Sequence, residues 1–157
     1  MPHIHEKIDF TVEVFIVYQN KVLLRKHDKY NIWLSVGGHI NLNEDPIQAA
    51  IREVKEEVGL DIKLADDLLA FKKQTDTYRE LIPPKFLNRH RINDSHEHVT
   101  LIYFATSSTD KVNIPEPEKS HSVEWKWFTK EELDKNTCGI HDDIIFYANR
   151  TLRELSK

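Results

Sequence analysis

The chain has 157 residues, enough for an ordinary hydrophobic core, and we expect residues 1–157 to form a single domain. Its formal net charge of −4, with 31% charged residues, argues against a nucleic-acid-binding surface, which would need a concentrated excess of Lys and Arg. The single cysteine, Cys138, excludes an intrachain disulfide framework, and no apolar run has transmembrane or signal-peptide character, so we expect a cytoplasmic protein without a membrane partner.

The first part of the chain is expected to form strands. Residues 9–18 are rich in β-branched and aromatic side chains, Gln19-Asn20 indicates a turn, and residues 21–26 indicate a returning strand. Residues 32–36 form a short extended segment that leads to Gly37-Gly38. This glycine pair permits a tight turn and a close approach of the backbone to a ligand.

A helix is expected to follow. Asp45 is an N-cap residue type, Pro46 suits the first helical position, and Gly59 is expected to end the helix. Apolar residues recur at helical spacing and predict one core-facing stripe. The stripe consists of Ile47, Ala50, Ile51, Val54 and Val58. We expect the glutamates of this helix to lie beside the stripe and not within it.

The second half of the chain is expected to alternate strands and helices. Residues 61–74, 99–105 and 122–128 indicate strands, and residues 75–95 form the longest irregular region, a length typical of functional or disordered loops. Thr129 to Glu132 form a capping box that opens a short helix, and residues 140–155 predict a longer amphipathic helix. The order of elements predicts an α+β fold with a mixed sheet sandwiched by helices.

The most informative feature is a set of three glutamates on the expected helix. Glu53, Glu56 and Glu57 are three and four residues apart, so their carboxylates project from one helix face. Like charges at this spacing repel, and a hard divalent cation that takes oxygen ligands would compensate them. The alternative is a solvated acidic face relieved by Arg52 and Lys55. The paired glycines before the helix and its caps favour the cation.

Residues 38–60 match the pattern G-x5-E-x7-R-E-U-x-E-E-x-G-U, where U is a bulky aliphatic residue, without exception. The matching positions are Gly38, Glu44, Arg52, Glu53, Val54, Glu56, Glu57, Gly59 and Leu60. This is the signature of the Nudix hydrolases, and the chain resembles that family over residues 8–155. The resemblance implies an α/β/α sandwich and hydrolysis of a phosphoanhydride bond in a nucleoside di- or triphosphate derivative. It also implies Mg²⁺ as the cofactor, which Mn²⁺ could replace.

The resemblance further implies roles for individual residues. Glu53, Glu56 and Glu57 would be metal ligands, with Glu57 central, and Gly38 would place its backbone carbonyl near the metal. One of these glutamates, or a carboxylate on a nearby loop, would act as general base. The other motif positions have structural roles. Glu44 and Arg52 would form an ion pair that holds the loop against the helix, and Gly59 would stop the helix.

Outside the motif, His96-Glu97-His98 precedes an expected strand. Family members often add a late glutamate to the metal or base set, and Glu97 is the candidate here; the alternative is a charged loop tip. His96 and His98 could ligate a softer metal, but the sequence offers no third partner at zinc-site spacing.

Three residues of the 75–95 region are candidate substrate contacts. Arg79 and Arg89 could bind phosphates, and Tyr78 stands at about the spacing seen in dinucleoside polyphosphate hydrolases; a solvated surface is the alternative for each. Two function classes remain: a metal-dependent pyrophosphatase acting on a small-molecule nucleotide, or a regulatory domain that binds a nucleotide without turnover. The intact motif favours the enzyme. We expect a monomer or homodimer with no nucleic-acid partner.

Overall fold

The computed structural model describes residues 3–27, 30–114 and 124–157. These residues form one eight-stranded mixed sheet in which five strands follow the order β3-β2-β1-β7-β5. Three further strands attach to it: β4 pairs with β1, β6 with β7, and β8 with β2. The strands are β1 Ile8–Tyr18, β2 Lys21–His27, β3 Ile32–Leu34, β4 Val36–His39, β5 Ile62–Leu64, β6 Phe86–Asn93, β7 His96–Ser107 and β8 Glu124–Thr129.

The two long central strands, β1 and β7, run parallel, in register from the pair Ile8 and Glu97 to the pair Val17 and Thr106. All other strand pairs are antiparallel. Residues 19 and 20, between β1 and β2, both have positive φ, as the predicted turn requires. The sheet therefore brings the start of β1 next to the start of β7, although the two segments are far apart in the sequence.

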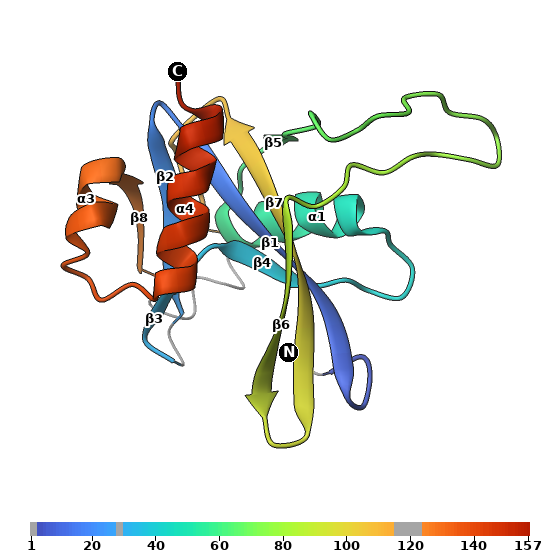
Figure 1. The fold of residues 1–157 in the computed structure, drawn as a ribbon, viewed down its shortest axis with the longest axis horizontal. Helices are drawn as coiled ribbons and strands as arrows, with labels where there is room; N and C mark the ends of the chain where they lie inside the picture. The colour runs from blue at the N-terminus through green and yellow to red at the C-terminus, as the bar shows by residue number, and fades with distance from the viewer. Residues whose placement is uncertain (1–2, 28–29, 115–123) are drawn as a thin grey trace.

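Helices cover both faces of this sheet (Figure 1). Helix α1 (Pro46–Val58) lies on one face, whereas α4 (Asp142–Leu155), with α3 (Lys130–Lys135) beside it, lies on the other. Successive side chains of a strand point to opposite faces. Val12 and Val14 of β1 accordingly pack in the same cluster as Val54 of α1, and Phe15 packs with Ile144 of α4. The predicted α+β fold with a mixed sheet between helices is confirmed.

The ends of α1 lie where the sequence predicts them. The Asp45 carboxylate accepts a hydrogen bond from the Gln48 amide at 2.9 Å, and the Gln48 side chain accepts one from the Asp45 amide at 2.9 Å. Gly59 adopts a left-handed conformation with φ of 69° and donates to the Lys55 carbonyl. An N-cap such as Asp45 contributes roughly 1 kcal/mol to stability, so local interactions fix the start of the helix. The capping box predicted at Thr129 and Glu132 is also present.

The buried face of α1 differs from the predicted stripe. Ile51 is 49% exposed, whereas Ala49 and Glu53 are fully buried together with Ala50 and the two valines of the stripe. Residues 49 and 53 are one helical turn apart and flank the stripe on the side away from Ile51, so the buried face is turned towards them. The expectation that all three glutamates lie beside the stripe is therefore wrong for Glu53, which lies within it.

The region after α1 also differs from prediction. Of residues 61–74, only Ile62–Leu64 form a strand, and within the expected loop 75–95 Phe86–Asn93 form β6. Strand β6 carries mostly polar and largely exposed side chains and is held by its pairing with β7, so no alternating hydrophobic pattern marks it. His96 to His98 consequently belong to β7. The strand predicted at residues 122–128 is β8, although residues 122 and 123 lie outside the described part of the chain.

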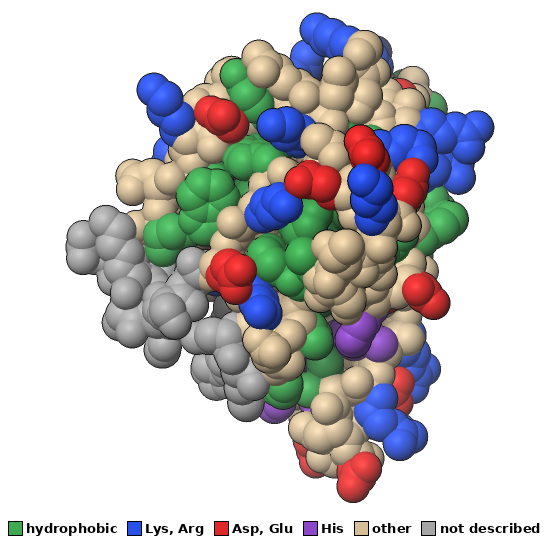
Figure 2. Space-filling model, turned by 90° about the vertical axis from the view of Figure 1, so that its left-hand side faces the viewer, with side chains coloured by type: hydrophobic (Ala, Val, Ile, Leu, Met, Phe, Trp, Pro, Cys, Tyr) green, Lys and Arg blue, Asp and Glu red, His purple; other side chains and the backbone are tan. Residues whose placement is uncertain are grey.

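Charged side chains of both signs are interspersed over the face that carries α3 (Figure 2). On α3 itself, Lys130 pairs with Asp134 at 2.5 Å and Lys135 with Glu131 at 2.9 Å. The described part of this face thus does not form a single basic surface. Within the described ranges, no helix is long and apolar enough to span a bilayer.

Candidate functional site

The three glutamates of α1 differ in the solvent exposure of their side chains. Their side chains are 2% exposed for Glu53, 14% for Glu57 and 58% for Glu56. Two arginines neutralise them. Arg52 donates to Glu53 at 2.9 Å and to Glu56 at 3.1 Å, and Arg25 of β2 forms an ion pair with Glu57. The repulsion between the carboxylates is therefore offset by two guanidinium groups. Arg52 comes from the same helix, and Arg25 comes from strand β2.

Lys55, which the alternative interpretation assigned to the acidic face, pairs instead with Asp61 at 3.1 Å. Arg25 was not identified from the sequence. Its pairing with Glu57 spans 32 positions and depends on β2 lying beside α1, so no local signal marks it.

Arg52 also fastens the loop before α1 to the helix. Its Nη2 and Nε donate to the two oxygens of Glu44 at 2.6 and 3.0 Å, and Nη2 donates to the His39 carbonyl at 2.9 Å. Glu44 in turn accepts from the Asn41 amide at 2.9 Å. The hydrogen bond from Arg52 is the main reason why the pKa of Glu44 is lowered. The predicted contact between Arg52 and Glu44 is present in the structure.

Gly38 of β4 lies directly against the carboxylate of Glu53. A Cβ atom at residue 38 would stand 2.4 Å from Glu53 Oε1 and 2.7 Å from Oε2, so only glycine allows this approach. Burial raises the pKa of Glu53, while the neighbouring Arg52 partly opposes that shift. A buried carboxylate, two more exposed ones and a nearby backbone strand offer hard oxygen donors. This donor set fits Mg²⁺ or Mn²⁺, which prefer such ligands.

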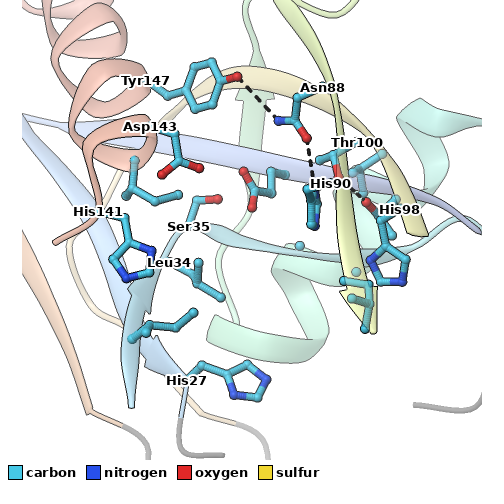
Figure 3. Close-up of a pocket in the computed structure, with 18 of the residues that line it drawn as sticks. His27, Leu34, Ser35, Asn88, His90, His98, Thr100, His141, Asp143 and Tyr147 are labelled. Atoms are coloured by element: carbon cyan, nitrogen blue, oxygen red, sulfur yellow. Dashed lines mark hydrogen bonds between the residues drawn. The ribbon is translucent and has the colours of Figure 1, made fainter. Parts of the chain in front are cut away.

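A cavity of about 680 Å³ lies between the sheet and the start of α4, and Gly38 contributes to its wall. Four histidines, His27, His90, His98 and His141, line it from four different parts of the chain (Figure 3). Several lining side chains are held by hydrogen bonds. Asn88 donates to the Tyr147 hydroxyl at 3.4 Å, Asn88 Oδ1 contacts His90 Nδ1 at 3.0 Å, and Thr11 and Thr100 share a bond of 2.6 Å.

Glu13 also lines this cavity and comes from the middle of strand β1, between the buried residues Val12 and Val14. Burial raises the pKa of Glu13 to about 7; the negative charge of Asp143 acts in the same direction, and a hydrogen bond with Ser35 opposes it. Near neutral pH the carboxyl group is therefore present both with and without its proton. The sequence interpretation missed this residue, although a glutamate inside a buried strand is a recognisable signal.

The residues predicted outside the motif do not join the glutamate cluster. Glu97 lies in β7 and accepts two hydrogen bonds from Arg89 of β6, at 2.6 and 3.0 Å. Glu97 is in register with Ile8, whereas Gly38 is in register with Val12, four residues further along β1. Four residues of strand span about 13 Å, so Glu97 lies well away from Glu53 along the sheet.

Of the predicted substrate contacts, Arg89 lines the cavity. Arg79 and Tyr78 are exposed in the segment between β5 and β6 and are not among the cavity-lining residues that the structure describes. The Tyr78 ring packs edge-on against Phe71 at 5.9 Å.

Comparison with known proteins agrees with the fold. The NUDIX domain family model matches residues 9–149. The chain is 30% identical over 137 residues to an RNA pyrophosphohydrolase of Bartonella clarridgeiae, covering 83% of this chain and 75% of the relative. The crystal structure of a NUDIX-family hydrolase from Clostridium perfringens superposes with a TM-score of 0.81 at 34% identity, covering 94% of this chain and 98% of that one. A MutT protein from Methanosarcina mazei shares the fold, with a TM-score of 0.66 at 16% identity over 98% of this chain and 99% of that one.

The family match and these relatives identify the chain as a hydrolase of acid anhydrides. The chain belongs to the Nudix family, whose members here include enzymes that act on pyrophosphate bonds.

Proposed function

We propose that this protein hydrolyses a phosphoanhydride bond in a small nucleoside di- or triphosphate derivative, using a divalent cation held by Glu53, Glu56 and Glu57. One observation carries the proposal. Gly38 lines the cavity and also lies against the Glu53 carboxylate, so a single strand separates a space of nucleoside size from the carboxylate cluster. A nucleoside in the cavity could therefore present its phosphates to the glutamates at the edge of β4.

The residues around the cluster suit the handling of phosphates. Glu53, Glu56 and Glu57 would hold Mg²⁺ or Mn²⁺ together with the Gly38 carbonyl, and one of these glutamates would accept the proton of the attacking water. When bound, the cation supplies charge neutralisation on the phosphate oxygens and activation of water. Arg25, beside Glu57, places a guanidinium group where it can bind phosphate oxygens. Arg52 keeps the loop and the helix together through its contacts with Glu44.

The polar groups of the cavity suit the recognition of a nucleobase. Asn88 and Ser35 provide fixed hydrogen-bonding groups, and Glu13 can both donate and accept because its pKa lies near 7. The cavity volume is in the range of sites that enclose one drug-sized ligand. This size favours a mononucleotide derivative. The name of the Bartonella relative adds a second candidate, the 5′ end of an RNA, whose first nucleotide could occupy the same cavity.

The test is product analysis over a panel of nucleoside triphosphates, oxidised nucleotides, dinucleoside polyphosphates, nucleotide sugars and 5′-triphosphorylated RNA. Each substrate is assayed with Mg²⁺, with Mn²⁺ and with excess chelator. We expect metal-dependent cleavage of at least one mononucleotide derivative. Cleavage of the RNA alone would show that the substrate is the 5′ end of an RNA and not a mononucleotide derivative. Full activity in chelator would refute the metal site.

Variants of the cavity provide a second readout. Asn88→Ala should raise KM because it removes a cavity hydrogen-bonding group, whereas Leu87→Ala, at a neighbouring β6 residue whose side chain is 64% exposed, should not. Equal KM values for the two variants would show that the nucleoside binds elsewhere.

A further inference from the structure

A second group of possible metal ligands lies at the other end of the sheet from the turn between β1 and β2. His3 comes from the N-terminal segment, Asp9 from the start of β1, and His96 and His98 from the start of β7. One ligand atom of each residue lies within 4.8 Å of all the others. Asp9 and His96 are fully buried, at 0% and 2% exposure, so this is not a solvated surface cluster.

The spacing of these atoms suits tetrahedral coordination. Asp9 Oδ2 lies 3.4 Å from His3 Nδ1 and 3.2 Å from His96 Nε2. Zinc binds imidazole nitrogen and carboxylate oxygen at about 2.0–2.1 Å, which places neighbouring donors of a tetrahedron about 3.3 Å apart. The separations of Asp9 from His3 and from His96 therefore already match those that such an ion requires, and the His98 donor atom lies within 4.8 Å of all three.

The hydrogen bonds around the cluster orient its ligands. His96 Nδ1 lies 3.1 Å from the Glu6 carbonyl, an acceptor, so this nitrogen carries the proton and the Nε2 lone pair faces Asp9. Asp9 itself accepts from the amides of His5 at 2.6 Å and Ile4 at 3.1 Å. Metal-binding histidines commonly donate their second nitrogen to a carbonyl in this way.

The cluster contains two buried imidazole nitrogens whose hydrogen-bonding capacity is not satisfied by the described residues. Nε2 of His96 and Nε2 of His98 are buried without a hydrogen-bond partner among the residues that the structure describes. A buried polar atom without a partner is costly, and a bound cation would satisfy both.

The simpler alternative is that Asp9 is only a buried anion balanced by a protonated histidine. His39 Nε2 also lies 3.1 Å from Asp9 Oδ2 and could supply that positive charge. One proton suffices to balance one carboxylate, however, and the other imidazoles would then be left with unsatisfied lone pairs. Charge balance alone thus does not account for the convergence of four histidines.

We propose that His3, Asp9, His96 and His98 bind a zinc-class transition metal ion at a site separate from the glutamates. Imidazole nitrogen favours zinc over magnesium. Strand alternation places Asp9 and His98 on the face of the sheet that α4 covers, whereas Glu53 belongs to α1, which covers the opposite face. Bound metal would join the N-terminal segment to β7 and fix His98, which lines the cavity.

The proposal is tested by Zn²⁺ titration of metal-free full-length protein against a chromophoric chelator, without nucleotide. We expect the wild type to bind one equivalent, with a rise in Tm, because an ion that binds only the folded state stabilises it. Co²⁺ in place of Zn²⁺ should give the visible absorption of a tetrahedral site. Because nucleotide is absent, the outcome does not depend on the proposed hydrolase activity.

Four variants locate the site. His3→Ala and His98→Gln should each weaken Zn²⁺ binding by at least about 10-fold, the lower end of what losing even an outer-shell partner costs. His5→Ala, in the same segment but outside the cluster, and Glu57→Gln, in the glutamate cluster, should bind Zn²⁺ like the wild type. His3 is 43% exposed, so His3→Ala should fold normally in chelator and remains decisive if His98→Gln does not fold. Failure of the wild type to bind one equivalent, or unchanged affinity in His3→Ala, would overturn the proposal.

Discussion

Replacement of Gly38 by alanine should disrupt the site through a single steric contact. The added Cβ would stand 2.4 Å from Glu53 Oε1 and 2.5 Å from its Cδ, so one of the two groups must move. The end of a glutamate side chain is usually free to turn away. Here it is not, because Glu53 is 2% exposed and its Oε1 accepts a hydrogen bond from Arg52 at 2.9 Å.

The expected cost follows from this confinement. Overpacking of a closed site costs about 1–3 kcal/mol. For a domain of this size, that corresponds to a fall in Tm of about 3–10 °C. A displacement of about 1 Å at a reacting group costs on the order of 10²-fold in rate, so kcat should fall by roughly this factor.

Thermal denaturation and steady-state kinetics of Gly38→Ala, Glu53→Asp and their double variant test the explanation. Shortening Glu53 by one methylene withdraws the carboxylate, so the double variant should be more stable than additivity predicts by at least about 0.5 kcal/mol. Glu56→Asp is the matched control: it shortens a glutamate of the same helix that is 58% exposed, and its effect should add to that of Gly38→Ala. Wild-type Tm and kcat in Gly38→Ala, or strict additivity with Glu53→Asp, would refute the steric reasoning.

Three further predictions concern other contacts. A double-mutant cycle between Arg52→Ala and Glu44→Ala should give a coupling of about 0.5–3 kcal/mol; no coupling would mean that their ion pair does not hold the loop. The raised pKa of Glu13 means that the folded state favours its neutral form, so stability should fall by up to about 3 kcal/mol as pH rises from 4.5 through 7. Glu13→Gln should flatten this part of the Tm–pH profile, and an unchanged profile would contradict the assignment. Glu97→Gln should keep kcat near wild type because Arg89 holds that carboxylate away from the helix glutamates. A large loss of kcat would show that Glu97 acts as a catalytic residue.

The elements that could be predicted from the sequence are those defined by local signals. Helix α1 is bounded by Asp45 and Gly59, residue types that fix helix ends, and the glutamate spacing follows from helical periodicity. Strand β1 was recognised from its β-branched and aromatic residues. The family signature falls within one such segment, which is why the fold class and the carboxylate cluster could be inferred together.

The remaining features depend on contacts between distant segments. Arg25 reaches Glu57 only because β2 lies beside α1, and β6 forms because β7 offers it an edge. The third partner that His96 and His98 lacked in the sequence is Asp9, which β1 brings next to them through parallel pairing. Sequence spacing cannot reveal such a site, because its ligands come from the N-terminal segment, β1 and β7, which are far apart in the sequence.

The most direct test of the proposed active site is the kcat of Glu57→Gln, measured with saturating Mg²⁺ on the best substrate of the panel. The substitution keeps the size of the side chain and removes the charge that would face the cation. Cys138→Ser, at an exposed cysteine that is not among the residues of the proposed site, is the control. We predict a loss of at least about 10²-fold in kcat for Glu57→Gln with no loss for the control. Near-normal turnover of Glu57→Gln would contradict the assignment of the α1 glutamates as the catalytic metal site.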